Sequence, residues 1–176
     1  MKAVTLEEYF STIWKQDWSQ FYLTGYSVLA QLPTDGTETI LDVGCGFNPL
    51  KRWFGDRLWG IDPYNAFADE QVSIEDYKSD WKYDIAIAFG SINFGTFTEV
   101  FTQTRKMVSH VKPGGKIIWR QNPGVHDHPN PEFQDIKLFP WSFRLNMEMA
   151  EELNCEVVDL RWDNNRIYSE WKCIGS

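Results

Sequence analysis

Two glycines and a carboxylate follow short apolar runs at a spacing that suits a nucleoside site. Gly44 and Gly46 stand directly after the run TILDV at 39–43, and a glycine lets the backbone turn sharply and approach a ligand closely. Asp62 ends the next apolar run, 16 positions after Gly46, where a carboxylate can accept hydrogen bonds from both ribose hydroxyls of an adenosine. An isolated Gly-x-Gly is also an ordinary tight turn, so the prediction of an adenosine site depends on this combination.

The glycine turn differs from the fingerprint of dinucleotide-binding proteins at the third glycine. That glycine lets the helix pack closely and present its N-terminus to a pyrophosphate, but here Pro49 occupies the position. Proline suits the first turn of a helix and removes an N–H that could bind phosphate. Asp42, in the same loop, would be a poor neighbour for an anion. The turn therefore favours a cationic, phosphate-free nucleoside over a pyridine dinucleotide.

Four motifs in order extend this interpretation: LDVGCGFNP, WGIDPYN, YDIAIAFGSIN and VKPGGKIIW. The series resembles that of class I S-adenosylmethionine-dependent methyltransferases over roughly residues 39–176. The resemblance implies a Rossmann-like α/β fold with an open, mostly parallel sheet, and S-adenosylmethionine as the cofactor. Phe89-Gly90-Ser91 stands where amino-directed DNA methyltransferases carry an Asn/Asp-Pro-Pro-aromatic motif, which disfavours that subclass.

The resemblance also implies roles for individual residues. The glycine turn would hold the methionine end of the cofactor, the carboxylate after the second strand would hold the ribose, and the mouth of the fourth strand would lie near the sulfonium. The implied cofactor-binding residues are Asp42, Gly44, Cys45, Gly46, Asp62, Pro63, Tyr64, Asp76, Tyr77, Phe89 and Gly90. Asp76 and Tyr77 are the expected neighbours of the adenine amino group. Because that segment is short, Glu75 and Asp80 are alternatives to Asp76.

His126 and His128 are the candidates for acid–base chemistry. They lie in a proline-rich loop after the run KIIWR, on the edge where open α/β sheets bind ligands. Either could act as a general base or line the acceptor pocket. Paired histidines also suit a metal ion, but no matching Cys, His or carboxylate framework accompanies them, so we predict no metal site. Methyl transfer from a sulfonium depends mainly on alignment, and a dedicated catalytic residue is not required.

An aromatic-rich N-terminal segment should lie over the ligand. Its apolar residues recur at spacings near three, four and seven, with Thr5 available as a cap, which predicts one or two helices. We expect residues 1–35 to form a helical lid. Phe10, Trp14 and Trp18 are secondary candidates for shaping the acceptor site.

The remaining residues, 36–176, should form the Rossmann-like core, and the whole chain 1–176 one domain. Apolar runs predict buried parallel strands at 39–43, 58–62, 72–75, 84–89 and 116–120. Periodicity predicts helices near 96–110 and 141–153 and a final antiparallel hairpin from 155–162 and 166–173. Only about nine residues separate the second and third expected strands, fewer than a parallel crossover normally needs. A helix there should be a turn or two long, or absent.

Composition narrows the class of partner. The formal net charge of −8 and the pI near 4.9 disfavour a nucleic-acid surface, so we expect a small-molecule acceptor, neutral or cationic, or else a protein. The three cysteines lack metal-ligand spacing, no apolar run reaches the roughly 20 residues that span a bilayer, and the N-terminus lacks the apolar core of a signal peptide. We therefore expect a cytoplasmic protein.

The sequence leaves more than one function open. A methyltransferase is the leading hypothesis. The alternative is a non-catalytic cofactor- or partner-binding module that keeps the methyltransferase-like fold, and an oxidoreductase using a pyridine nucleotide comes third. The acceptor and the oligomeric state are not written in these residues.

Overall fold

The fold is built on one six-stranded sheet. The computed structural model describes residues 3–15, 26–33, 35–128 and 130–175. Strand order is β2-β1-β3-β4-β6-β5; the first four strands run parallel, and β6 is antiparallel to both neighbours. The strands are β1 (Ile40–Val43), β2 (Leu58–Ile61), β3 (Tyr83–Phe89), β4 (Val111–Gln121), β5 (Cys155–Asp163) and β6 (Arg166–Cys173). The expected α/β class, with a mostly parallel sheet and a C-terminal hairpin, is confirmed.

Four of the five predicted parallel strands are present. The fifth, predicted at 72–75, is absent from the sheet. Val72 and Ile74 pack on the main core from a loop. The backbone turns at Ser73, whose carbonyl accepts the N–H groups of Asp76 and Tyr77. A side chain that satisfies local backbone groups competes with strand pairing, and Ser73 Oγ also accepts the N–H of Asp76. The prediction of a strand here was therefore wrong.

The connection from β2 to β3 consequently spans residues 62–82. This segment is described throughout and contains no helix. It returns to the edge of the sheet once, where Ile61 bridges Glu70, and then passes to β3 on the far side of β1. The apparent shortage of residues in the crossover came from counting 72–75 as a strand.

Two long helices cover one face of the sheet. They are α4 (Phe97–Ser109) and α5 (Phe143–Glu152), close to their predicted ranges. A capping box joins Thr96 and Glu99 at the start of α4, because each side chain accepts a backbone N–H of the other. Val100 and Met107 of α4 and Met149 of α5 are buried in the main core with the inner side chains of β4.

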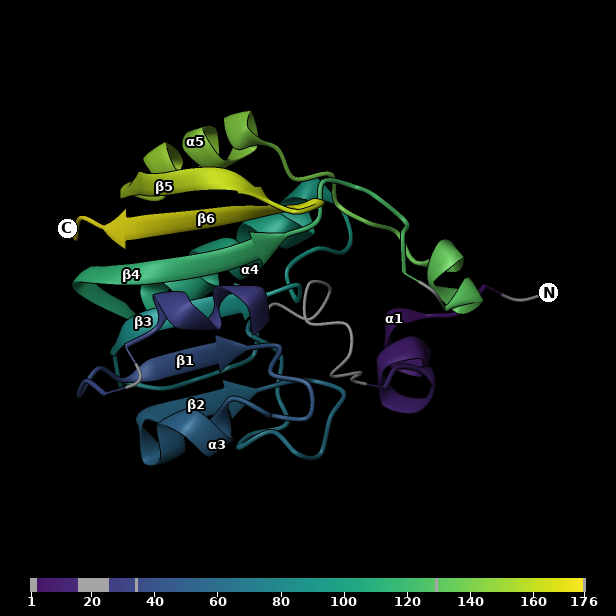
Figure 1. Ribbon diagram of the computed structural model, residues 1–176, viewed down its shortest axis with the longest axis horizontal. Coiled ribbons are helices and arrows are strands. Elements are labelled where there is room, and N and C mark those ends of the chain that lie inside the picture. Colours follow the sequence, from purple (N-terminus) through teal and green to yellow (C-terminus); the bar gives the residue numbers. More distant parts are fainter. Residues whose placement is uncertain (1–2, 16–25, 34, 129, 176) are drawn as a thin grey trace.

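The opposite face carries shorter elements. A 3-10 helix (Tyr26–Gln31) and α3 (Lys51–Phe54) bury Val28, Leu50 and Phe54 against β1, β3 and β4. In Figure 1 the 3-10 helix lies in front of the sheet and α4 behind it. A sheet covered on both faces accounts for the continuous apolar runs of its parallel strands.

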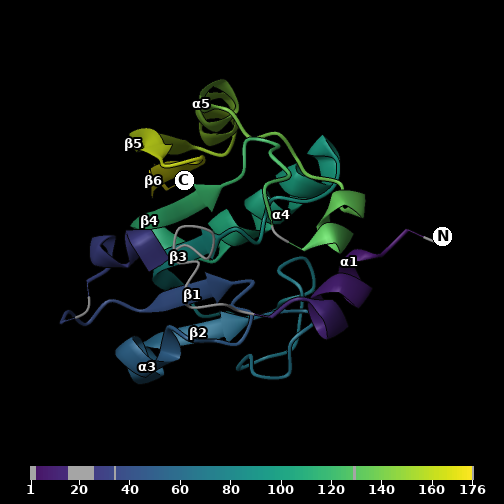
Figure 2. The same cartoon turned by 45° about the vertical axis from the view of Figure 1, so that its right-hand side comes forward.

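The N-terminal residues form a separate layer beyond the strand ends. Helix α1 (Leu6–Glu8) begins at Thr5, whose Oγ1 accepts the N–H of Glu8, and continues as a π-helical stretch (Tyr9–Ile13). The predicted helix is thus short, and Trp18 lies outside the described residues. Figure 2 shows α1 beside the short helix at 131–135, where Tyr9 packs on Phe133.

Candidate active site

A cavity of about 280 Å³ opens at the carboxyl ends of β1 to β4. Parallel strands end at the same edge of a sheet, and open α/β folds bind ligands there. In Figure 1 the arrowheads of β1, β2 and β4 point toward the side on which α1 lies. The lining comes from the glycine turn, the residues after β2 and β3, the end of β4, the loop after it, and the N-terminal segment.

Backbone geometry makes the glycine turn specific. Gly44 has a φ of 73° and Gly46 a φ of 58°, values that a residue with a Cβ adopts only under strain. A Cβ on Gly44 would lie 2.1 Å from Cβ of Ser91, and one on Gly46 would lie 2.9 Å from the ring of Trp14. The turn therefore has glycine at the two positions where Ser91, after β3, and Trp14, in the N-terminal segment, approach its backbone.

Asp62 is bound to the glycine turn through backbone groups. Its Oδ2 accepts the N–H of Gly46 at 3.0 Å, and its Oδ1 accepts the N–H of Tyr64 at 2.8 Å. Burial raises the pKa of Asp62, and these N–H groups lower it in part. Each carboxylate oxygen has a second lone pair, so this fixed carboxylate can still accept hydrogen bonds from a ligand in the cavity.

Asp42 brings a second carboxylate to the same end of the cavity. It is buried at 5% exposure within β1. Burial, followed by the negative charges of Asp62 and Asp69, raises the pKa of Asp42 to about 7. A carboxyl with this pKa is partly protonated at neutral pH, and a nearby positive charge would ionise it. The site therefore favours a cationic ligand.

Most of the residues that the resemblance assigned to the cofactor lie on this cavity. The lining includes Asp42, Gly44, Cys45, Gly46, Asp62, Pro63, Tyr64, Phe89 and Gly90. Burial raises the pKa of the Cys45 thiol, with Asp42 contributing, so this cysteine stays protonated and is a small lining residue. The ring of Tyr64 stacks on Phe10 with 6.3 Å between ring centres.

Asp76 and Tyr77 lie away from this lining. Asp76 accepts a hydrogen bond from Ser73 Oγ at 3.0 Å, and Tyr77 is a buried core residue whose hydroxyl contacts that of Tyr83 at 2.8 Å. Ser73, Ile74 and Glu75 line the cavity instead. The turn at 73–76 presents its first three residues to the cavity, which a strand at 72–75 would not have done.

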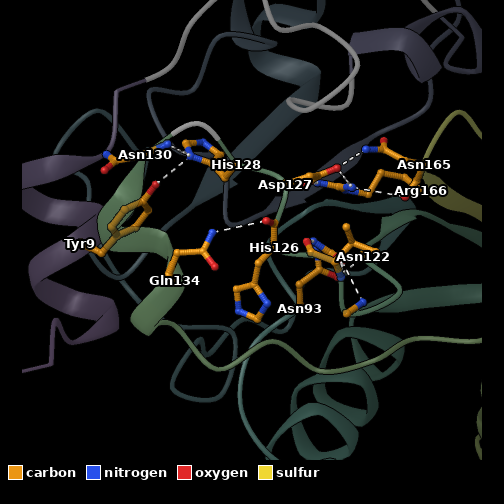
Figure 3. Close-up of polar contacts among 12 residues, drawn as sticks. Tyr9, Asn93, Asn122, His126, Asp127, His128, Asn130, Gln134, Asn165 and Arg166 are labelled. Atoms are coloured by element: carbon orange, nitrogen blue, oxygen red, sulfur yellow. Dashed lines mark hydrogen bonds and ion pairs between the residues drawn. The ribbon is translucent and has the colours of Figure 1, made fainter.

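His126 anchors the loop after β4 and does not line the cavity. Its Nε2 donates to the carbonyl of Ile136 at 2.9 Å. Asn122 shapes the start of this loop, because its Oδ1 accepts the N–H groups of Gly124 and Val125, and Asn93 accepts the N–H of Asn122. Figure 3 shows Asn93, Asn122 and His126. Of the two histidine candidates, only His128 faces the cavity.

The lone pair of His128 is already engaged. The N–H of Asn130 donates to Nδ1 at 3.2 Å, and the hydroxyl of Tyr9 lies 3.3 Å from the same atom (Figure 3). A ring nitrogen that accepts a backbone N–H carries no proton, so the neutral ring has its proton on Nε2. Burial lowers the pKa of His128, and this favours the neutral form. In this arrangement His128 is a donor rather than a base.

Two buried arginines line the cavity and were not singled out from the sequence. Arg120, on β4, donates from Nε to Asp163 at 2.8 Å. Arg166, at the start of β6, binds Asp127 through both terminal nitrogens at 3.0 and 2.8 Å (Figure 3). Arginine in a strand pattern ordinarily indicates a solvent-facing position, so the only available signal was that KIIWR ends in a charge at the ligand-binding edge.

Two features are absent from the part of the chain that the structure describes. The described residues contain no group of three or more His, Cys, Asp or Glu side chains that could hold a metal ion. None of their helices is both long and apolar enough to cross a membrane.

Similar proteins were found by structure and not by sequence. No protein-family model matches the chain, and no curated protein matches it. The magnesium protoporphyrin IX methyltransferase of Synechocystis PCC 6803, solved with bound S-adenosylmethionine, is 13% identical with a TM-score of 0.68, covering 95% of this chain and 94% of that one.

Two other solved structures are similar to a comparable degree. The 1,6-didemethyltoxoflavin-N1-methyltransferase of Burkholderia thailandensis, with its substrate and S-adenosylhomocysteine bound, is 11% identical with a TM-score of 0.69 and covers 90% and 81% of the two chains. An S-adenosylmethionine-dependent methyltransferase of Mesorhizobium loti is 12% identical with a TM-score of 0.63, covering 85% and 97%. The chain therefore has the fold of class I S-adenosylmethionine-dependent methyltransferases, as the motif series implied.

Proposed function

We propose that this protein transfers a methyl group from S-adenosylmethionine to a small-molecule acceptor. The observation that carries the proposal is the junction of Asp62 with the glycine turn. The carboxylate that would bind a ribose is hydrogen-bonded to the backbone of Gly46, and Gly44, which has no Cβ, lets Ser91 lie against the turn. Fold alone does not determine function, but here the fold and the donor set point to the same ligand.

The charges of the cavity support this cofactor over a dinucleotide. Asp42 and Asp62 line it at the glycine turn, and their carboxyl groups would repel a pyrophosphate held by that turn. S-adenosylmethionine supplies a methyl group on a positively charged sulfur, which these residues would attract. Asp62 would hold the ribose, and the turn from Gly44 to Gly46 would hold the methionine end.

The other half of the cavity would hold the acceptor. Tyr9 of the N-terminal segment and Phe133 of the loop after β4 line it with Arg120. These side chains would exclude water and hold the acceptor in one orientation, the main protein contribution when the leaving group is already activated. A cavity of about 280 Å³ suits a small molecule better than a polymer.

A second candidate is a non-catalytic module that binds the cofactor without turnover. The engagement of His128 Nδ1 by Asn130 favours it, since an acceptor that must lose a proton would find no free base on this histidine. If the acceptor is already ionised at neutral pH, methyl transfer needs no base. Turnover of such an acceptor would therefore distinguish a methyltransferase from a non-catalytic module.

The test is isothermal titration of the protein with S-adenosylhomocysteine, with NAD as the competing ligand. We expect micromolar binding of S-adenosylhomocysteine and none of NAD. Asp62→Asn should weaken binding at least tenfold, because the carboxylate that joins ribose and turn is lost. The matched control is Asp56→Asn, which changes an exposed carboxylate just before β2 and should bind as the unaltered protein does. Binding of NAD alone, or equal loss in both variants, would contradict the proposal.

A further inference from the structure

Arg120 carries a buried donor with no partner. Among the described side chains, buried nitrogen or oxygen atoms without a hydrogen-bond partner occur in Glu38, Asn48, His110, Trp119 and Arg120. Only Arg120 of these also lines the cavity. Its side chain is 2% exposed and the orphaned atom is Nη2. A buried charged donor left unsatisfied is unfavourable, which indicates a partner that arrives with the ligand.

The neighbouring groups fix the arginine and leave its free end for that partner. Asp163 accepts from Nε of Arg120, and Asp127 occupies both terminal nitrogens of Arg166. Arg166 adds positive potential because it also lines the cavity. The ion pair with Asp163 thus holds one edge of the Arg120 guanidinium and leaves Nη2 uncommitted.

Aromatic side chains form the rest of this end of the cavity. Tyr9 packs against Phe133 with ring centres 5.6 Å apart, and the ring of His128 lies 5.0 Å from that of Phe133. His128 directly follows Asp127, the partner of Arg166. Tyr9, His128 and Phe133 all line the cavity. Such a wall binds a flat apolar body through its rings, while a single polar group at the edge fixes the orientation.

We propose that the acceptor is an aromatic carboxylate whose carboxylate group binds Arg120 Nη2, an inference that rests on the proposed methyltransferase function. A guanidinium binds a carboxylate by charge-assisted hydrogen bonds. A phosphate dianion would be repelled more strongly by Asp42 and Asp62 in the same cavity. A carboxylate is already ionised at neutral pH. One of its oxygens would form the new bond to the methyl carbon while the bond from sulfur to that carbon breaks, and neutral S-adenosylhomocysteine would leave. The transfer would therefore need no base from His128.

This inference reverses the expectation of a neutral or cationic acceptor. That expectation came from the net charge of −8, which sets the field outside the molecule. Inside the cavity the groups that line it determine which ligand charge is favoured, because charges interact more strongly where water is excluded. At the end of β4 the buried donor without a partner is Nη2 of the Arg120 guanidinium.

The experiment titrates three acids against the protein, each beside its neutral amide: benzoate, phenylacetate and indole-3-acetate, with benzamide, phenylacetamide and indole-3-acetamide. Binding is measured by calorimetry with and without saturating S-adenosylhomocysteine. We expect at least one acid to bind at least tenfold more tightly than its amide. Arg120→Met should reduce that preference to within twofold, while Arg144→Met, an exposed arginine on α5, should leave it unchanged.

A second variant guards against misfolding. Arg120→Met removes the guanidinium that pairs with Asp163. The double variant Arg120→Met with Asp163→Asn removes both charges, and each variant is checked by circular dichroism. If no acid is preferred over its amide, or if the preference survives both variants, the inference is overturned. Failure of S-adenosylhomocysteine to bind overturns the proposed function instead. The acid-to-amide ratio without that ligand still decides the role of Arg120.

Discussion

The end of the cavity proposed for the cofactor, around Gly44 and Asp62, and the end proposed for the acceptor, around Tyr9 and Arg120, are built in different ways. At the cofactor end, Gly44 and Cys45 donate their N–H groups to Ile61 O, and Gly46 donates to Asp62. These contacts join the ends of two adjacent strands. At the acceptor end, side chains connect segments that lie far apart in the chain: Tyr9 with His128, and Arg166 with Asp127. The cofactor end follows from the register of the sheet, whereas the acceptor end depends on individual side chains.

This difference explains why the cofactor end could be predicted from the sequence. Strand register places β1 beside β2 whatever the side chains of the loops are, so a turn motif and a carboxylate 16 positions later meet reliably. The loop after β4 has no such constraint, and its shape depends on the caps and ion pairs that Asn122 and Asp127 make. The two ends should therefore respond differently to substitution.

The largest effect should follow from adding a methyl group at the cofactor end. Gly44→Ala places a Cβ 2.1 Å from Cβ of Ser91 at a φ of 73°. Gly114→Ala is the matched control, with a φ of 78° and open space around the added atom. Both variants bear a backbone strain of about 1 kcal/mol, but only Gly44→Ala should also weaken S-adenosylhomocysteine binding, by about 100-fold or more. Calorimetry measures the binding and chemical denaturation the stability; equal loss in both variants would break the comparison.

The next effect concerns the charge of Asp42. Its pKa is about 7 in the folded protein and 3.8 at its ordinary value, so between these pH values the folded state holds a proton that the unfolded state has lost. The free energy of unfolding therefore falls as pH rises from about 4 to 7. Asp42→Asn removes this penalty and should stabilise the protein by about 2–4 kcal/mol at pH 8, with little change at pH 4.

The same substitution should weaken binding of S-adenosylmethionine about tenfold at pH 8. A bound cation would ionise Asp42, so binding by the unaltered protein should release a proton and strengthen as pH rises from 6 to 8. Denaturation curves at both pH values and calorimetry in buffers of different ionisation enthalpy check these outcomes. A variant that is both less stable and unchanged in binding would show that Asp42 is not a buried charge at the cofactor end.

At the acceptor end, Arg166→Met should loosen the loop without reaching the cofactor. It leaves Asp127 without its bidentate partner, which should lower the free energy of unfolding by about 2–3 kcal/mol. The affinity for S-adenosylhomocysteine should stay within about twofold, because none of the contacts of Asp62 involve this loop. Arg161→Met, an exposed ion pair on the same hairpin, is the control and should change stability by under about 1 kcal/mol.

The smallest expected effect separates two neighbouring carboxylates. Glu75 lines the cavity, whereas Asp76 is bound to Ser73 outside it. Glu75→Gln should weaken S-adenosylhomocysteine binding about fivefold, and Asp76→Asn should change it by less than about twofold. The reverse order in a calorimetric titration would restore the assignment of Asp76 that the motif series implied.

Several particular residues mark where sequence reasoning was sufficient. The glycine turn, Asp62 and the apolar runs of β1, β3 and β4 were predicted, because backbone conformation and burial on two faces restrict the residue types that can stand there. The prediction of a strand at 72–75 was wrong because the backbone turns at Ser73. His126 and His128 looked equivalent in sequence, yet only His128 faces the cavity.

The sequence by itself determined the order of the strands along the chain, the turn that follows β1 and the carboxylate that meets it. These features rest on local preferences and on the period of burial, which are written in consecutive residues. Only the tertiary structure decided which carboxylate after Asp62 reaches the cavity, which histidine faces it, and that Arg120 ends there with a free donor. Each of these depends on long-range packing and on the partners that a side chain meets, and neither is encoded in the spacing of neighbouring residues.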